Sequence, residues 1–238
     1  MLPVLHGLSV LISLAMAIYM IARQPKAALN RTSAAVMLCV ALWAFKYMFT
    51  YNPYASMKAV WLGELVGSFG WTLMLPLLLL FFIIFTENTA RLRGKYLLAY
   101  LLSYALPACI IYQHTGGFFF EHVKESYGWG LLWPYSPLTY LFYIYMFIGM
   151  ILCVNMITTY VKNEKRPFMV KRAQHLIFST YFTFVVIFLF AVVLAYLGIT
   201  FIPDLSNLIA CFWGLSLLYG DMKYQFYSAP DVPVAVSA

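Results

Sequence analysis

The sequence predicts an all-α membrane protein, a bundle of seven transmembrane helices, and three observations support this. Hydrophobic residues make up 64% of the 238 residues and charged residues only 10%, whereas soluble domains have about 45–50% and about 25%. The mean hydropathy is +0.84. The apolar residues are also grouped in runs that match the ~20 residues a bilayer-spanning helix needs. This composition excludes a soluble enzyme, a disordered chain and a secreted disulfide scaffold.

Seven apolar runs follow one another along the chain, separated by short polar segments. The first has no basic segment before it and is followed by Arg23, so we interpret it as a retained helix and not as a secretory signal. The third is long enough to be tilted, or kinked at Pro76, and Pro107 falls in the outer half of the fourth. The predicted spans are Leu2–Ala22, Thr32–Tyr51, Met57–Phe85, Tyr96–Gln113, Leu138–Tyr160, Ala173–Leu197 and Asp204–Tyr224.

The segments outside the spans predict one ordered loop and one tail. Residues 114–137 are rich in glycine and aromatic residues, and β-prone runs around Gly128–Gly130 predict a small β-hairpin over the bundle. Residues 1–224 then form the membrane domain. We expect the tail 225–238, with its two prolines, to leave the membrane and lead to an output domain that this chain lacks.

The distribution of Lys and Arg predicts the topology. Of the 15 basic residues, 12 follow the first, third and fifth spans or lie at the end of the seventh, two lie on the opposite side, and Lys46 lies within a span. Because cytoplasmic loops carry the excess of basic residues, we expect the N-terminus outside and the tail in the cytoplasm. A count of six spans would break this alternation. The net charge of +7 therefore reflects topology and indicates no nucleic-acid partner.

Catalytic and cofactor motifs are absent from the sequence. It contains no HExxH, GxSxG, P-loop, CxxC or GxGxxG pattern, so we expect no catalytic residue and no cofactor. Lys223 lies at the end of the seventh span and not midway, which excludes a retinal pigment. The spacing of His6, His114 and His122 supports no metal site. Apolar runs hold all four cysteines, which predicts neither a disulfide nor a zinc site: Cys39, Cys109, Cys153 and Cys211.

Lys46 and Glu64 are the ionisable residues that stand out inside the spans. They lie at similar depths in two spans joined by a tight turn, so we expect them to meet. Two interpretations stay open: a structural one, as an ion pair or as side chains reaching toward water, and contact with a ligand. Gly63 and Gly67, with Gly70 beyond, form a small-residue pattern that favours close helix packing over a ligand cleft.

Polar and aromatic residues gather in the outer halves of several spans, which favours a pocket open to the outside. The alternative is an interfacial aromatic belt, which does not account for the charged and amide residues. We expect apolar walls with a few polar groups, roofed by the loop Phe118–Trp133, to bind a small amphipathic ligand whose acidic head meets Lys46. The predicted ligand-binding residues are Lys46, Tyr47, Glu64, Tyr140, Tyr143 and Asn207.

The seventh span is predicted to carry a signal inward, because it alone joins the tail. Asp204, Asn207, Cys211 and Gly214 recur at spacings that place them on one helix face. Gly214 predicts a point of close packing, where a small helix displacement is easiest.

The order of several motifs resembles that of a known family. These are VWLGEL and LPLLLLFFIIFTEN within Val60–Asn88, the Gly/Trp-rich loop in Phe118–Tyr145, KRPFMVKRAQ at Lys165–Gln174, IPDLSNL at Ile202–Leu208 and the end of the chain from Tyr219 to Ala235. Together they resemble the N-terminal seven-transmembrane region of bacterial sensor histidine kinases, over nearly the whole chain. Each motif alone is weak, and their order and spacing carry the resemblance.

The resemblance implies a membrane sensor module. Such a module would bind an extracellular or membrane-borne small ligand and pass the signal through the seventh helix to a cytoplasmic kinase or cyclase output domain. It implies the bacterial inner membrane, a homodimer in the full-length protein, and no kinase activity in this chain, which has no phospho-acceptor helix and no ATP-binding domain. The resemblance supplies no ligand residues. The alternative is a small transporter or membrane enzyme, but no internal repeat supports it.

Overall fold

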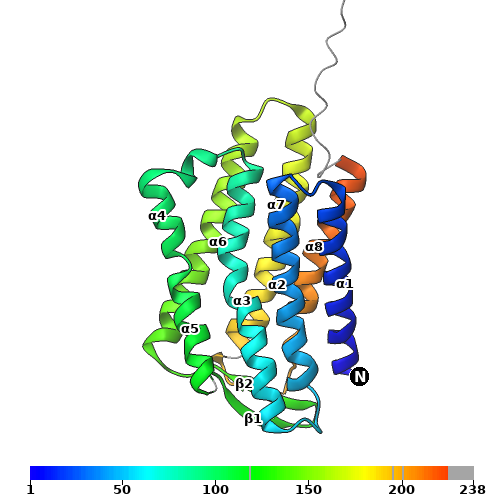
Figure 1. Ribbon diagram of the computed structural model, residues 1–238, viewed down its shortest axis with the longest axis vertical. Helices are drawn as coiled ribbons and strands as arrows, with labels where there is room; N and C mark the ends of the chain where they lie inside the picture. The colour runs from blue at the N-terminus through cyan, green and yellow to red at the C-terminus, as the bar shows by residue number, and fades with distance from the viewer. Residues whose placement is uncertain (118, 195, 200, 225–238) are drawn as a thin grey trace, which may run out of the picture.

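The computed structural model describes residues 1–117, 119–194, 196–199 and 201–224 as a bundle of long helices (Figure 1). The tail 225–238 and Phe118 lie outside the described residues. A 3-10 turn (Thr89–Leu92) precedes α4, and a π-helical segment, η2 (Leu189–Leu194), continues α7. The helices are α1 (Leu2–Arg23), α2 (Ala28–Thr50), α3 (Met57–Phe85), α4 (Gly94–Leu102), α5 (Ala105–Gly116), α6 (Pro137–Asn163), α7 (Pro167–Phe188) and α8 (Ser206–Tyr224).

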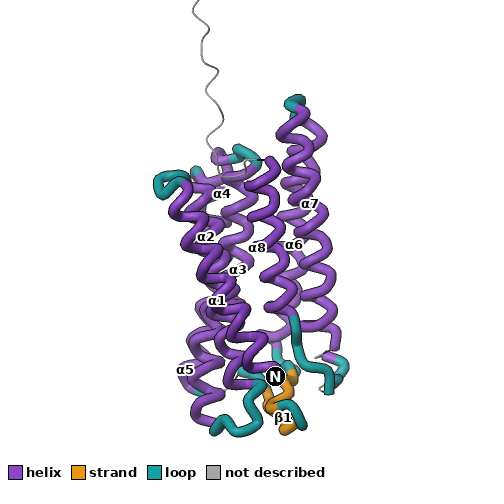
Figure 2. The backbone as a smooth tube through the Cα atoms, turned by 90° about the vertical axis from the view of Figure 1, so that its right-hand side faces the viewer, coloured by secondary structure: helices purple, strands orange, loops and turns teal. Residues whose placement is uncertain are grey.

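Six helical segments of the described chain are long and apolar enough to cross a membrane: α1, α2, α3, Leu97–Gly116 across α4 and α5, α6, and Pro167–Leu194. The seventh, α8, is shorter and carries Asp221 and Lys223 in its last turns, and it packs alongside α1 and α7 (Figures 1 and 2). The N-terminus lies at the same end as the hairpin, and α8 ends at the opposite end (Figure 1). We call these the outer and inner ends, following the predicted orientation.

Helices α2 and α3 form the centre of the bundle and are joined by glycine packing. A Cβ built on Gly70 would meet the backbone of α2, 2.5 Å from the Trp43 nitrogen, and one built on Gly63 would lie 3.0 Å from the Phe49 ring. Small residues at such positions let helix backbones approach closely. The predicted packing role of these glycines is confirmed. By contrast, α1, α6 and α7 each expose a row of large apolar side chains, as lipid-facing helices do.

The fourth span is broken, which corrects the single helix expected over Tyr96–Gln113. The chain bends at Ser103 and Tyr104, between α4 and α5. Proline has no N–H, so Pro107 cannot donate the helical hydrogen bond to the carbonyl of Ser103. The hydroxyl of Tyr145 on α6 donates to that carbonyl instead, at 3.0 Å. The outer half of the span therefore starts a new helix. The other central proline, Pro76, lies within α3, which continues through it.

The predicted hairpin is confirmed and covers the outer end of α2 and α3. Strands β1 (Glu121–Glu125) and β2 (Gly128–Leu132) pair antiparallel, with Val123 opposite Gly130. Gly128 has a φ of +138°, and a Cβ there would lie 2.5 Å from the Thr50 carbonyl oxygen, so this close approach requires glycine. Lys124 donates from Nζ to the carbonyl of Pro53, at 2.8 Å. These contacts hold the hairpin against the turn between α2 and α3.

Candidate functional site

A cavity of about 80 Å³ lies toward the outer end, between α2, α3, α6, η2, the hairpin and the segment before α8. This volume holds several water molecules or the head of a small ligand. Its polar wall consists of Lys46, Tyr47, Tyr51 and Asp204. The remaining wall is aromatic toward the hairpin and aliphatic toward the membrane centre, and includes Trp43, Trp71, Phe120, Tyr127, Trp133, Phe142, Met146, Met150, Ile187 and Phe188.

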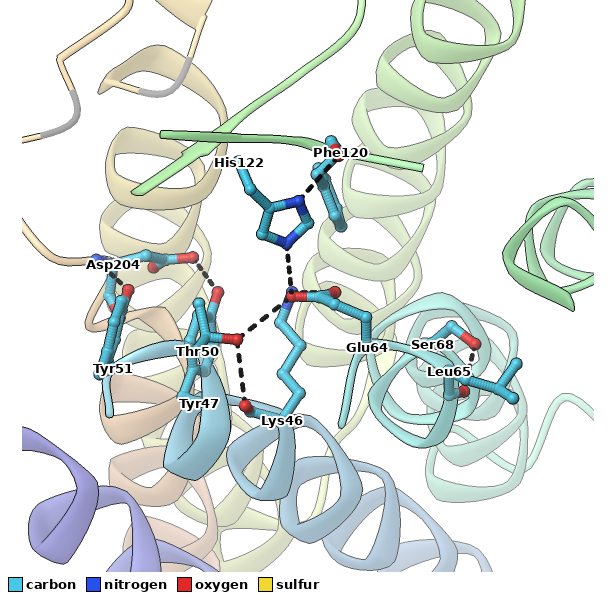
Figure 3. A network of polar contacts seen from close by, with 10 residues as sticks. All are labelled: Lys46, Tyr47, Thr50, Tyr51, Glu64, Leu65, Ser68, Phe120, His122 and Asp204. Atoms are coloured by element: carbon cyan, nitrogen blue, oxygen red, sulfur yellow. Dashed lines mark hydrogen bonds and ion pairs between the residues drawn. The ribbon is translucent and has the colours of Figure 1, made fainter. Parts of the chain in front are cut away.

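Lys46 of α2 and Glu64 of α3 form a buried ion pair beside this cavity (Figure 3). The distance from Nζ to Oε2 is 3.2 Å, and the exposed fractions of the two side chains are 2% and 0%. Thr50 donates from Oγ1 to the other carboxylate oxygen, at 3.3 Å. A Cβ on Gly67 would lie 2.6 Å from Cβ of Lys46, so this glycine makes room for the lysine stem. The expectation that Lys46 and Glu64 meet is confirmed.

The ammonium group of Lys46 also faces aromatic rings. Its Nζ lies 4.7 Å from the ring centroids of Tyr47 and Phe120, and 5.9 Å from that of Trp71. Ring faces attract cations at these distances. The lysine is therefore held by one carboxylate and by the quadrupoles of its neighbours. An acidic ligand head would have to compete with Glu64 for it.

The hairpin adds a histidine to the ion pair. His122 Nε2 lies 3.9 Å from Glu64 Oε1, and Nδ1 lies 3.0 Å from the Phe120 carbonyl, to which it donates (Figure 3). Burial lowers the pKa of His122 below 6.5, and the Lys46 charge lowers it further, while Glu64 opposes both. The nearby His114 is fully buried against Trp71. In the described part of the chain, no group of three His, Cys, Asp or Glu residues could hold a metal ion.

A second polar group joins α2 to the start of α8. The Tyr47 hydroxyl donates to the Asp204 carboxylate. The Tyr51 hydroxyl donates to the Asp204 carbonyl at 3.0 Å and accepts from its N–H. Asp204 Oδ1 in turn accepts from the N–H of Ser206, the first residue of α8, at 2.8 Å, in an Asx turn that leads into the helix. One carboxylate therefore lines the cavity and also binds the N–H of the first residue of α8.

The structure separates the six predicted ligand-binding residues. Lys46 and Tyr47 line the cavity, and Glu64 lies directly behind Lys46. Asn207 is fully buried beside His6, apart from the cavity wall. Tyr140 and Tyr143 line a different, lipid-facing groove.

The rotation of α6 explains why its two tyrosines miss the cavity. Phe142, Met146 and Met150, spaced four residues apart, share the face that lines the cavity. Tyr140 and Tyr143 lie on the adjoining face, beside η2, where Tyr143 and Tyr196 have ring centroids 6.3 Å apart. The sequence pattern identified both faces as aromatic or apolar and did not distinguish them.

Two wall residues were missing from the predicted set although the sequence carried a signal for each. Tyr51 lies four residues after Tyr47, on the same face of α2. Asp204 stands two residues before Ser206, a spacing at which an aspartate side chain commonly bonds the backbone N–H in a turn. The residues expected on one face of the seventh span lie in α8 from Asn207 onward, and Cys211 of that face contacts Ser9 and Ser13 of α1. Asp204, expected on the same face, lies before the helix begins.

Comparison with known proteins identifies the family. A search of curated proteins finds no match to the chain. A family model described as the N-terminal 7TM region of histidine kinase matches residues 5–230, which is nearly the whole membrane domain. The apolar helices, the seven-helix arrangement and this match agree. The chain therefore belongs to the family of N-terminal seven-transmembrane regions of histidine kinases.

Proposed function

We propose that this chain is the signal-receiving module of a histidine kinase in the bacterial inner membrane. A small amphipathic ligand, extracellular or membrane-borne, enters the outer cavity, and α8 passes the change to a cytoplasmic kinase or cyclase output domain. In the complete protein the module works as a homodimer. Lys46 and Tyr47 contact the ligand, and Glu64 positions Lys46. Tyr140, Tyr143 and Asn207 are not proposed as contacts, because they lie outside the cavity wall.

The observation that carries this proposal is the double role of Asp204. Its carboxylate lines the cavity and also accepts a hydrogen bond from the N–H of Ser206, the first residue of α8. A ligand that draws the carboxylate toward itself, or competes with Tyr47 for it, therefore acts directly on the first turn of the helix that leads to the tail.

Helix α8 offers a continuous path from that turn to the inner end. Cys211 lies 2.7 Å from Ser9 Oγ on α1, and the space at Gly214 is filled by the flexible side chains of Met16 and Met37. At the inner end Asp221 accepts from the Tyr19 hydroxyl, at 2.7 Å. Thioether side chains adapt to small shifts, and helix displacements of about 1–2 Å act as switches when the receiving element is bistable.

A reporter fusion tests the path. The chain is joined to a dimeric kinase reporter, and one to four residues are inserted after Lys223. A transmitted helix movement predicts output that rises and falls with helical phase. Output that ignores the insertions would leave α8 as an anchor only and remove the proposed path.

The same fusion tests the ligand contact. Lys46→Met is expected to weaken the response while the protein still reaches the membrane. Adding Glu64→Gln, which removes the unpaired carboxylate, should restore stability and leave the response weak. If the double variant responds like the native chain, Lys46 has only a structural role.

A further inference from the structure

We propose that the cavity is selective for a ligand with a positively charged organic head, an amine or quaternary ammonium, which lies against Asp204. This inference rests on the proposed function and assigns the chemical class of its ligand. It also reverses the charge expected from the sequence, where Lys46 suggested an acidic head.

The charges on the cavity wall carry the argument. Lys46 is matched by Glu64 at 3.2 Å, so this pair adds no net charge. Asp204 is half-buried, and no Lys or Arg among the described residues forms an ion pair with it. Its carboxylate accepts from two neutral donors, the Tyr47 hydroxyl and the Ser206 N–H. The wall therefore carries one uncompensated negative charge, and an ionised residue at such a site is a candidate for ligand recognition.

The aromatic wall near Asp204 suits a cation. The rings of Tyr47 and Tyr51 are stacked with centroids 4.9 Å apart, and Tyr127 meets Tyr51 edge to face at 5.4 Å. All three line the cavity together with Asp204. Aromatic rings around a carboxylate are the arrangement that recognises ammonium groups with little penalty for lost water. The wall already holds one ammonium in this way, that of Lys46 over Phe120.

The rest of the cavity suits an apolar tail. Met146 and Met150 of α6 and Ile187 of α7 line it further toward the membrane centre. The π-helical segment η2 adds side chains to the same wall, including Val192 and Leu194. π-helical turns are rare and are frequent at functional sites. A head at Asp204 and a tail among these residues give the ligand a defined orientation.

Binding to the purified chain tests this inference without an output domain. The full chain in the uncharged detergent dodecyl maltoside is titrated with hexyltrimethylammonium, hexanol or hexanoate, and tryptophan fluorescence reports binding, since Trp43, Trp71 and Trp133 line the cavity. We expect saturable binding of the cation, at least tenfold tighter than that of either other probe. Asp204→Asn should weaken cation binding at least tenfold and leave hexanol unchanged. Glu121→Gln, which removes an exposed carboxylate at the same end, should change neither.

A second variant covers the case in which Asp204→Asn does not fold. Tyr127→Leu removes a ring and keeps the carboxylate, and it should weaken cation binding several-fold with hexanol unchanged. Tighter binding of hexanoate, equal binding of the cation by native and variant chains, or no saturable binding would each overturn the inference. The insertion experiment on α8 reads the signal path separately, so it can succeed when this one fails.

Discussion

The ion pairs at the outer and inner ends of the bundle differ in how far they are removed from water. At the outer end, Lys46 and Glu64 are enclosed by protein, with exposed fractions of 2% and 0%. At the inner end, Asp221 is buried but its partner Arg23 is 47% exposed, with 3.2 Å between Nε and Oδ2. Between them the bundle is closed by aromatic and aliphatic packing such as Phe81 against Trp213.

This difference indicates where the molecule is sensitive. A buried charge that loses its partner has no water to replace it, whereas an exposed pair is worth little, because water and salt screen it. The outer end therefore combines a cavity with a buried ion pair, Lys46 and Glu64, in which each charge depends on the other for the stability of the fold. At the inner end, Asp221 of α8 is buried too, but the Arg23 that pairs with it from α1 is half exposed, so water can take over part of that contact.

The largest expected effect comes from breaking the outer pair. Glu64→Gln leaves Lys46 buried without its carboxylate and should lower the free energy of unfolding by about 3–5 kcal/mol. Unfolding of the purified chain in mixed detergent micelles measures it. The double variant Lys46→Met/Glu64→Gln should recover most of the loss, because no unpaired charge remains. Equal losses in the single and double variants would contradict the buried-pair explanation.

The glycine contacts between α2 and α3 should give the next largest effect. Gly70→Ala places a methyl group against the backbone of α2, and Gly67→Ala places one against the stem of Lys46. Overpacking of this kind costs about 1–3 kcal/mol, read from the same unfolding measurement. Gly116→Ala is the matched control, since a Cβ there meets nothing within 4 Å. If Gly70→Ala left the free energy of unfolding unchanged, α2 and α3 could move apart at this point at little cost, which would contradict the close-packing explanation.

A pH change should act on the outer end through His122. Its pKa is below 6.5 in the folded chain, so between that pKa and 6.5 the unfolded chain binds more protons, and stability falls as pH is lowered. Among the described residues, Glu64, Lys46 and His114 act on the charge of the ring. The melting temperature at pH 7.5, 6.0 and 5.0 should therefore fall less in His122→Gln than in the native chain. Identical pH profiles would exclude this contribution.

The smallest effect is expected at the inner loop. Hydrogen bonds from Arg166 lower the pKa of Glu164 to about 2. The stabilisation from this charged pair is therefore present above the ordinary pKa of glutamate and is lost only as pH falls toward 2. Glu164→Gln should change the free energy of unfolding by about 0–1 kcal/mol, with the same small difference at pH 7.5 and pH 5.0. A difference that grows between those values would show that the carboxylate titrates higher.

The sequence alone was sufficient for the order of the spans, except for the break in the fourth, and for the hairpin and the meeting of Lys46 with Glu64. These features are local: span length and apolar composition define each crossing, turn residues define the hairpin, and the short turn at residues 51–56 brings two neighbouring spans together at matched depth. The family followed from the order of such local motifs, and the match over residues 5–230 agrees with it.

The tertiary structure alone decided which side chains share the cavity. Tyr47 and Asp204 meet across 157 residues of sequence, the histidine of the hairpin reaches Glu64, and the face of α6 that turns inward is that of Phe142 and not that of Tyr143. Each of these contacts depends on the rotation and relative depth of helices that are distant in the chain. Periodicity identifies the apolar side of one helix. In a membrane, however, lipid tails and protein neighbours are equally apolar, so only the packed structure shows which apolar side chains face protein and which face lipid.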